Sequence, residues 1–363
     1  MRIFAPVLTK LKLIMKKNLR NFLTLALGFV TVIATAQTWD ANSRTRVDMG
    51  GDNDRFQSEQ RTSLGVNWGG NGWGINVSAN HNYDLGTGGS TMSWNEANAT
   101  TDLMGYATVT VGRQALDYGS GAIVGSNDWA ANPNTWDGGV FAINNDMLGL
   151  DLGVYRNNNG GEEEDGTTNY FLNASKSEGD WSLNLLYLSG DNGEENGKST
   201  AMGLDISYAL MDGDLDLAVS YNTATDDMVE EDMDMMSIGA TYNVNDDLSV
   251  SATRTTYGEG GFSMTGSNIG GADSWNTHGN MGYLAANDED MAFGVSYSMG
   301  DFDLGITMHT VSNEANENDR KVTEANLSYS MSDNANVGVK YATDDNGTDT
   351  ETKYMWLTLS VTP

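Results

Sequence analysis

Charged side chains stand at alternate positions of several otherwise apolar segments, a placement that could steer ions. The bases are Arg44, Arg46, Arg61 and Lys340, and the acids are Asp151, Asp205, Asp214, Asp216, Asp303 and Glu324. Opposed charges across a narrow aqueous passage set a transverse field, and an excess of acids favours cations. Charges scattered through a wide aqueous lumen, with no effect on selectivity, are an equally good interpretation of any single residue.

Acidic connections are a second group of candidates. Residues 162–165, 226–234 and 344–349 are rich in carboxylates, whose oxygens can bind Ca²⁺. The last of these is similar to an EF-hand loop, but it lacks the sixth-position glycine and the following glutamate. The sequence therefore favours solvated loops without a metal, and divalent bridging to anionic lipid headgroups is the alternative.

Catalytic chemistry has little support. His81, His278 and His309 are far apart in sequence, no cysteine is present, and neither G-x-S-x-G nor H-E-x-x-H occurs. A barrel enzyme could still assemble a triad from distant strands. An enzyme is therefore only a remote alternative, and no cofactor is expected.

The charge balance excludes nucleic acid as a partner. The chain has 19 Lys and Arg against 50 Asp and Glu, a net charge of −31. Residues 1–36 contain six bases and no acid, so the remainder carries 13 bases against 50 acids, or −37. Phosphate backbones need basic partners, which this balance does not supply.

The N-terminus has the pattern of a secretory signal peptide. From Met15 a basic start leads to an apolar stretch at residues 22–33 and then to Ala34-Thr35-Ala36. We expect residues 1–36 to be a leader, with translation starting at Met1 or Met15, and the mature chain to begin at Gln37. A membrane anchor is disfavoured because the apolar stretch is short.

Apolar residues recur at every second position through most of the chain after Gln37, as in residues 148–154, 202–210 and 302–308. The positions between them hold mostly Gly, Ser, Asn, Thr and Asp rather than the Lys and Glu of a soluble sheet surface. An apolar face opposite a face of small polar groups is typical of transmembrane β-strands. The predicted fold class is all-β, a transmembrane antiparallel β-barrel.

The lengths of the connections give an independent count of the strands. Strands are expected to begin near residues 40, 59, 73, 91, 105, 137, 147, 168, 180, 199, 214, 234, 247, 290, 302, 321, 335 and 352. Short and long connections alternate between them, as periplasmic turns and external loops do in outer-membrane barrels. This predicts about 18 strands in one domain, residues 37–363, in the outer membrane of a Gram-negative bacterium.

A tyrosine precedes four of the tight turns, namely Tyr208, Tyr242, Tyr297 and Tyr329. Tyrosines at one depth on successive strands form an aromatic girdle, with the ring in the lipid boundary and the hydroxyl in water. The repeat therefore supports the strand register.

The connection between residues 116 and 136 is unusually apolar for a loop exposed to water, since it includes Tyr118, Ile123 and Val124. Burial against the inner wall would lower its free energy. We expect it to fold into the lumen, and packing among the external loops as a lid is the alternative. The predicted constriction residues are Arg113, Asp128, Trp129, Trp136 and Asp137. Strict alternation would point Arg113 outward unless Gly112 bulges its strand.

Residues 111–119, 125–129 and 136–138 read VGRQALDYG, GSNDW and WDG, and this stretch resembles the alginate-export-like porins of the outer membrane. The resemblance implies an 18-stranded barrel and passage of anionic sugars through a pore lined by Arg and Lys. The sequence departs from the family pattern at Gly121-Ala122-Ile123, where the family usually has an arginine. Because bases are few, an alginate substrate is not carried over.

The predicted function is therefore that of a porin, a passive and mildly cation-preferring channel for small hydrophilic solutes. A substrate-specific oligosaccharide channel is the alternative. The expected partners are outer-membrane lipid and, in a homotrimer, further copies of the chain.

Overall fold

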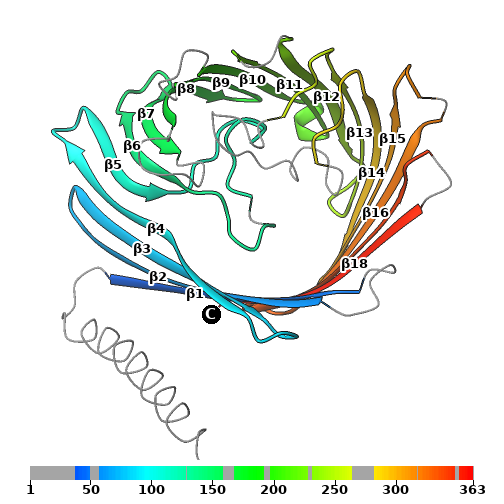
Figure 1. Ribbon diagram of the computed structural model, residues 1–363, viewed down its shortest axis with the longest axis horizontal. Coiled ribbons are helices and arrows are strands. Elements are labelled where there is room, and N and C mark those ends of the chain that lie inside the picture. Colours follow the sequence, from blue (N-terminus) through cyan, green and yellow to red (C-terminus); the bar gives the residue numbers. More distant parts are fainter. Residues whose placement is uncertain are drawn as a thin grey trace, which may run out of the picture.

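The computed structural model describes residues 37–49, 57–127, 129–157, 167–191, 197–227, 231–263, 282–316, 318–347 and 351–362. They form one antiparallel sheet of 18 strands, in which consecutive strands pair. The first strand also pairs with the last, so the sheet closes into a barrel (Figure 1). Closure leaves no strand edge with unpaired N–H and C=O groups, which a bilayer does not tolerate.

The strands are β1 (Gln37–Asp48), β2 (Gln57–Gly70), β3 (Trp73–Asp84), β4 (Ser90–Leu103), β5 (Ala107–Gln114), β6 (Trp136–Ile143), β7 (Gly149–Asn157), β8 (Thr167–Glu178), β9 (Trp181–Asp191), β10 (Lys198–Leu210), β11 (Leu215–Asp226), β12 (Met233–Asn243), β13 (Leu248–Tyr257), β14 (Glu289–Met299), β15 (Phe302–Ser312), β16 (Arg320–Ser332), β17 (Ala335–Asp345) and β18 (Glu351–Val361). A short 3-10 turn, η2 (Met211–Gly213), links β10 to β11.

Every strand begins within three residues of its predicted position. The prediction of an all-β, 18-stranded barrel is therefore confirmed. The predicted leader, residues 1–36, lies outside the described residues. Within the described part of the chain, no helix has the length and apolar character needed to cross a membrane.

The two ends of the barrel differ in the length of their links. Links of two to five residues follow the even-numbered strands, whereas links of five to 31 residues follow the odd-numbered ones. Outer-membrane barrels have short periplasmic turns and longer external loops. We therefore assign the long-link end to the extracellular side, which places the start of β1 and the end of β18 on the periplasmic side.

Alternate residues of each strand face opposite sides of the wall. On β15, Leu304 and Ile306 are 40% and 38% exposed, as expected of a surface that lipid covers. The next residue, Thr307, faces the lumen, and its cross-strand partner is Glu324, which is buried. The outer surface of these strands is thus apolar over its middle, and the acids Asp303 and Glu324 turn inward.

The four tyrosines lie near the short-link ends of β10, β12, β14 and β16, on the outward face. Tyr208, Tyr242 and Tyr297 are each about two-fifths exposed, and Tyr329 stacks on Phe302 with the ring centroids 4.5 Å apart. An aromatic girdle requires this placement, and the girdle role stays a prediction.

The lumen wall is not uniformly polar, contrary to the small polar face predicted for it. In the extracellular halves of β7–β12, buried apolar side chains face inward and form an inner apolar patch: Tyr155, Phe171, Leu186, Leu188, Ala201, Ala224 and Met235. On β9 both faces are apolar, because Leu185 and Tyr187 are exposed on the outer side. Such a patch is stable in a water-filled lumen only when another apolar segment covers it.

The assignment of faces can be tested on β15. Ile306→Lys should lower the free energy of unfolding by about 2–4 kcal/mol, because it places a charge in the lipid-facing surface. The matched control Thr307→Lys, whose side chain would lie beside Glu324 in the lumen, should cost less than about 1 kcal/mol. Urea unfolding in lipid vesicles measures both, and equal losses would contradict the assigned faces.

Candidate functional site

The candidate site is the inward loop, residues 115–135, which joins β5 to β6 and is described except for Asp128. At its stem Gly112 and Gly138 are cross-strand partners. Gly112 has φ +128, and a Cβ on it would clash with the backbone of Ala97. Glycine is therefore required where the stem presses against the neighbouring strand.

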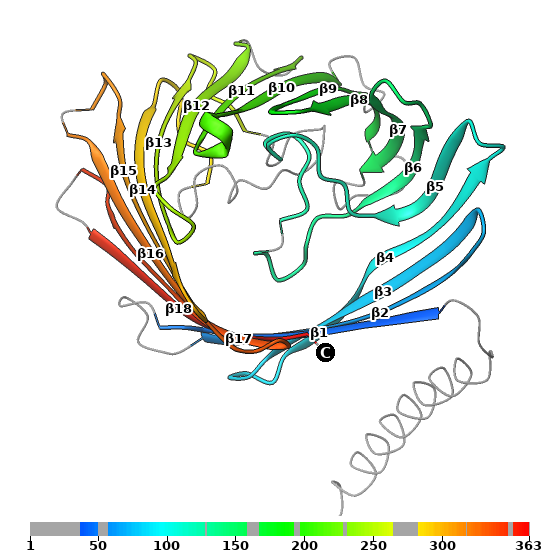
Figure 2. The ribbon, with the colours of Figure 1, turned by 180° about the vertical axis from the view of Figure 1, so that it is seen from behind.

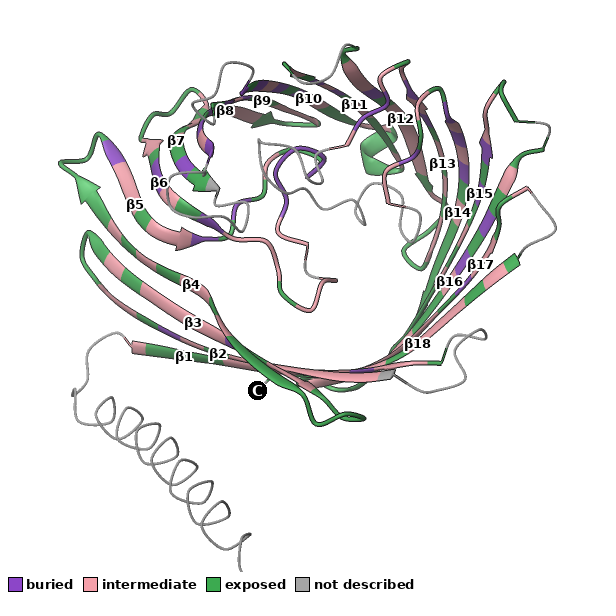
Figure 3. Cartoon of the chain, in the orientation of Figure 1, coloured by how far each residue is buried: buried purple, intermediate pink, exposed green. Residues whose placement is uncertain are grey.

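An apolar segment of the inward loop docks on one wall. Ala122, Ile123 and Val124 are at most 2% exposed and join the inner apolar patch in one buried cluster (Figure 3). The hydroxyl of Tyr283, from the long link between β13 and β14, donates to the carbonyl of Ala122 at 2.7 Å. The loop thus supplies the cover that the patch needs.

Polar contacts fix the same part of the loop. The backbone N–H of Ser120 donates to Oδ2 of Asp205 at 3.1 Å, and the hydroxyl of Ser220 lies 3.2 Å from that of Ser120. Gly119 has φ +58 and lies so close to Asp205 that a Cβ would clash with the carboxylate. Asp205, predicted to line the pore, therefore binds the loop backbone.

Tyr118 packs beside this contact, with its ring centroid 5.3 Å from that of Phe171. Burial raises the pKa of the Tyr118 phenol, and the nearby carboxylate of Asp151 raises it further. The phenol is therefore neutral at physiological pH. Its hydroxyl thus lies close to Asp151, another predicted pore acid.

The tip of the inward loop, Trp129 and Ala130, docks on β1 and β2. Arg46 donates to the carbonyl of Trp129 at 3.0 Å, and Arg44 and Arg61 each donate to the carbonyl of Ala130 at 3.0 Å. Arg46 also forms an ion pair with Glu59 at 3.2 Å. The three predicted pore arginines are thus engaged in holding the loop.

The Trp129 ring lies among basic side chains of the same wall. The guanidinium carbon of Arg46 is 3.7 Å from its centroid, the ammonium of Lys340 is 5.2 Å from it, and Trp356 meets it edge to face at 5.7 Å. Lys340 in turn pairs with Glu324 at 3.1 Å. Cation–π contacts in a desolvated setting contribute up to about 2 kcal/mol, so Trp129 anchors the tip.

The two anchors lie on opposite walls. The tip contacts β1 and β2, whereas Ser120 and Ile123 contact β10 and β11. In a closed ring of 18 strands β1 and β10 are nine strands apart in either direction. Figures 1 and 2 show the loop inside the barrel outline from both sides. The inward loop therefore crosses the lumen and reduces its open cross-section, as predicted for a loop folded inward.

Three predicted constriction residues lie on strands rather than in the loop. Trp136 is buried and meets Tyr155 edge to face at 6.3 Å. Arg113 pairs with Asp137 through two hydrogen bonds, Nε to Oδ1 at 2.8 Å and Nη2 to Oδ2 at 2.6 Å. Both share a face with exposed apolar residues of β5 and β6, because Gly112 leaves the register unbroken. Arg113 and Asp137 therefore lie on the outer side of the rim, and Asp128 lies outside the described residues.

The other predicted lumen acids lie nearer the periplasmic end. Asp303 accepts from the hydroxyl of Ser298 at 2.7 Å, and Asp216 is exposed on β11. Asp214 belongs to the turn before that strand rather than to the wall. These three acids are separate from the loop contacts.

Sequence reasoning missed several contacts of the loop. Asn132 accepts from Asn82 at 2.7 Å, Ala115 donates to Glu96 at 3.2 Å, and Trp356 meets Trp129. Asn82, Glu96 and Trp356 each occupy lumen-facing positions of their strands. Parity alone could have placed them inside, but nothing in the sequence relates them to the loop.

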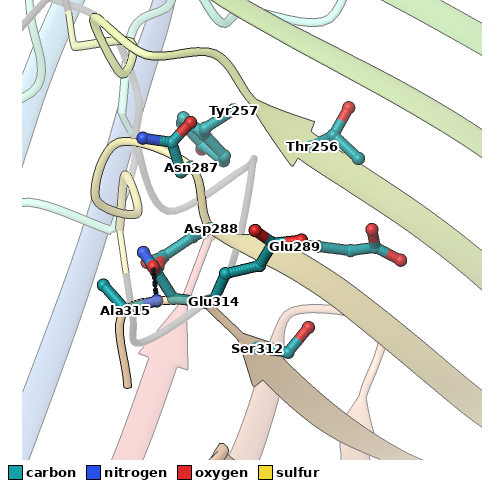
Figure 4. Close-up of a pocket in the computed structure, with 9 residues that line it drawn as sticks. Thr256, Tyr257, Asn287, Asp288, Glu289, Ser312, Glu314 and Ala315 are labelled. Carbon is teal, nitrogen blue, oxygen red and sulfur yellow. Dashed lines mark hydrogen bonds between the residues drawn. The ribbon is translucent and has the colours of Figure 1, made fainter.

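A cavity of about 760 Å³ opens at the extracellular end between β13, β14 and β15 (Figure 4). Asn313 closes one side by donating to Asp288 at 2.7 Å, and Glu289 and Glu314 line another. Nearby His309 lies 2.8 Å from Asp290. No group of three or more His, Asp or Glu residues in the described ranges could hold a metal.

A family model decides the class of protein. The model of the Gram-negative porins matches residues 23–354. The chain belongs to the Gram-negative porin family. Its predicted location in the outer membrane and its role as a passive channel for small solutes are confirmed by this membership. The comparison with curated proteins finds no match to this porin.

Solved structures with the same fold include several outer-membrane channels. OccK5 (OpdH) of Pseudomonas aeruginosa is 13% identical to this porin, with a TM-score of 0.70 and coverage of 90% of this chain and 98% of that one. OccAB4 of Acinetobacter baumannii is 12% identical, with a TM-score of 0.72 and coverage of 91% and 98%. OpdK of P. aeruginosa is 13% identical, with a TM-score of 0.72 and coverage of 90% and 98%. At these identities the similarity establishes the fold.

Undocking the inward loop should widen this porin. Ile123→Asp places a carboxylate in a buried apolar cluster, where the loss of hydration is unfavourable. Movement of the loop into water restores that hydration, so the variant should favour the undocked loop. Single-channel conductance should rise toward that of a variant lacking residues 119–134. Ile123→Val preserves the apolar contact and should leave conductance unchanged. A wild-type conductance in Ile123→Asp, with the barrel still folded, would show that the loop does not limit flow.

Proposed function

We propose that the inward loop forms the constriction of this porin and that the channel prefers small hydrophilic cations. One observation carries the preference: the acids that face the lumen outnumber the bases, and the bases are already engaged. Arg44, Arg46 and Arg61 donate to loop carbonyls, and Lys340 pairs with Glu324.

The lumen-facing carboxylates of the described strands include Asp40, Glu59, Glu96, Asp151, Asp205, Asp216, Asp290, Asp303 and Glu324, by strand parity. Bases on the same face are Arg44, Arg46, Arg61, Arg320 and Lys340. A narrow lumen with low-dielectric walls focuses the field of such an excess and concentrates cations. We therefore expect passive diffusion with mild selectivity. Hydrated cations would pass the Ser, Asn and Gly side chains of the lumen wall without binding at a dedicated site.

Ion preference is measured by the reversal potential of the reconstituted porin in asymmetric KCl. The sign should indicate passage of K⁺ over Cl⁻, and the combined variant Asp216→Asn and Asp303→Asn should move the potential toward zero. Neither carboxylate contacts the inward loop, so conductance should change less than selectivity.

Asp180→Asn, in the short turn between β8 and β9, removes the same charge outside the lumen and is the matched control. It should leave the reversal potential as in the wild type. An anion-selective wild type would overturn the proposed preference.

A second candidate function rests on the guanidinium of Arg46. Its Nε and Nη2 atoms are buried and make no hydrogen bond to a described residue. This edge of arginine is the one that binds a carboxylate through two parallel bonds, and Trp129 offers an aromatic surface beside it. The crystal structure of OpdK with vanillate has a TM-score of 0.70 to this chain at 12% identity. We therefore propose small aromatic carboxylates as the competing substrate class.

Block by an aromatic acid distinguishes the two proposals. If Arg46 serves solutes, vanillate should reduce the current at micromolar concentration, and Arg46→Met should weaken the block at least about tenfold, the effect expected of one lost charge-assisted bidentate pair. A general porin should show no block below millimolar vanillate. Vanillyl alcohol, which has the same ring and nearly the same size but no charge, is the neutral control.

The resemblance of residues 111–138 to alginate-export-like porins favours another kind of substrate-specific channel, one for oligouronates. Oligouronates would need a ladder of bases along the path. Three of the arginines that could build such a ladder bind the loop, which supports the general channel over this alternative. Porin membership likewise supports transport rather than catalysis as the function.

A further inference from the structure

The lipid-facing side of β1–β3 carries a group of polar side chains. Strand parity turns them outward, because the alternate positions face the lumen, where Arg44, Arg61 and Asn82 bind the inward loop. The outward group consists of Ser43, Thr45, Gln60, Thr62 and His81. Thr62 is the cross-strand partner of both Ser43 and His81. Thr45 lies opposite Gln60 in the next row. We call these five residues the outer polar patch.

The outer polar patch extends deeper into the lipid-facing surface than other polar groups do. Ser43 and Thr62 are each the sixth residue from the extracellular end of their strands. On the other described strands, outward polar or charged residues other than tyrosine and tryptophan lie within four residues of a strand end. At greater depth those strands present apolar groups, such as Leu204 and Ile306. The patch thus interrupts a surface that is otherwise apolar over its middle.

The same side of the barrel has no outward charge. The outward positions of β1–β4 include no Asp, Glu, Lys or Arg, and these four strands lie side by side in the wall (Figure 1). Of the other described strands, β11 and β15 alone share this property, and neither of them neighbours the other. Copies of a chain with net charge −31 repel one another. A broad face without charge is therefore where two copies can approach most easily.

Lipid tails offer the patch no hydrogen bonds, so polar side chains at this depth gain from a protein neighbour. Within one copy, Gln60 donates to the hydroxyl of Ser43 at 3.2 Å. The side chains of Thr62 and His81 form no hydrogen bond to a described residue. Their donors and acceptors point away from the barrel, toward whatever covers this face.

We infer that the outer polar patch binds the same patch of a second copy of this chain, about a two-fold axis normal to the membrane. Hydroxyl, amide and neutral imidazole groups each donate and accept, so identical patches can bind each other without opposite charges. Ala41 and Ala79, beside the patch on the outer face, are small and let a second barrel approach closely.

The number of patches decides the number of copies. A patch that meets its own equivalent about a two-fold axis closes the assembly at two copies, whereas a ring of three needs two different surfaces on each copy. The described strands carry a single patch of this kind. The patch therefore favours a dimer over the homotrimer that we expected from the sequence.

Cysteine crosslinking locates the contact, because the chain has no cysteine of its own. Ser43→Cys and Thr62→Cys, each tested alone in full-length barrels in lipid vesicles, should form covalent dimers on oxidation with copper phenanthroline. Ile206→Cys is the matched control, since it also faces lipid but lies on β10, nine strands from β1. It should remain uncrosslinked under the same oxidation.

Sedimentation equilibrium in a neutral detergent measures the number of copies and the dissociation constant of the dimer. The combined variant Gln60→Leu, Thr62→Val and His81→Leu should raise that constant roughly twentyfold, about threefold for each hydrogen bond lost between side chains in the membrane. The matched control removes outward hydroxyls from β11 and β15, as Thr223→Val with Thr310→Val. It should keep the wild-type constant.

Each outcome decides the inference. A wild type that stays monomeric or forms trimers would overturn it, as would equal dissociation constants for the wild type and the triple variant. Equal crosslinking of Ile206→Cys would show chance collisions, and crosslinking of Thr62→Cys in cells to a different protein alone would show another occupant. Apolar replacements suit a lipid-facing surface, so the triple variant should fold. If it does not, His81→Leu alone should still raise the constant about threefold.

Discussion

The requirement that every backbone group in the bilayer be paired governs this structure. A closed sheet meets it, and closure through β1 and β18 makes each strand present one face to lipid and one to the lumen. The outer face must then be apolar, and charged residues of the strands must turn inward or lie at the ends. The positions of the lumen acids and of the arginines around the loop tip both follow from this division.

Closure also creates an interior too wide for side chains to fill. The inward loop solves this by docking on two opposite walls with different chemistry. One anchor is apolar, where Ile123 and Val124 cover the patch around Leu188. The other is polar, where arginines donate to the carbonyls of Trp129 and Ala130. The apolar contact stabilises the loop by burial, and the arginine contacts fix where the tip lies.

The sequence predicted the strands well because parity and loop length are local signals that lipid enforces along the whole chain. It predicted the inward loop from its own apolar residues, Tyr118, Ile123 and Val124. It did not predict the wall that receives them, because alternation was taken to mean a polar interior. The run Leu183 to Leu188, apolar at almost every position, carried that signal. The use of Arg44 and Arg61 on loop carbonyls could not be predicted, since it depends on a contact between residues some 70 to 86 positions apart.

The same contacts separate charge across the lumen. On the wall of β1, β2 and β17 the bases Arg44, Arg46, Arg61 and Lys340 surround the loop tip, and on the wall of β7 and β10 Asp151 and Asp205 lie beside its other end. The barrel wall keeps these two groups of charges on opposite sides of the lumen, while Arg46 and Lys340 also pair with Glu59 and Glu324 on their own wall. We propose that a dipolar solute passing beside the loop meets a field directed across the channel, which orders its orientation without a binding site. Because the arginines also fix the tip, a change that weakens that field at β1 and β2 also loosens the loop, so the proposed selectivity and the proposed constriction depend on the same three side chains.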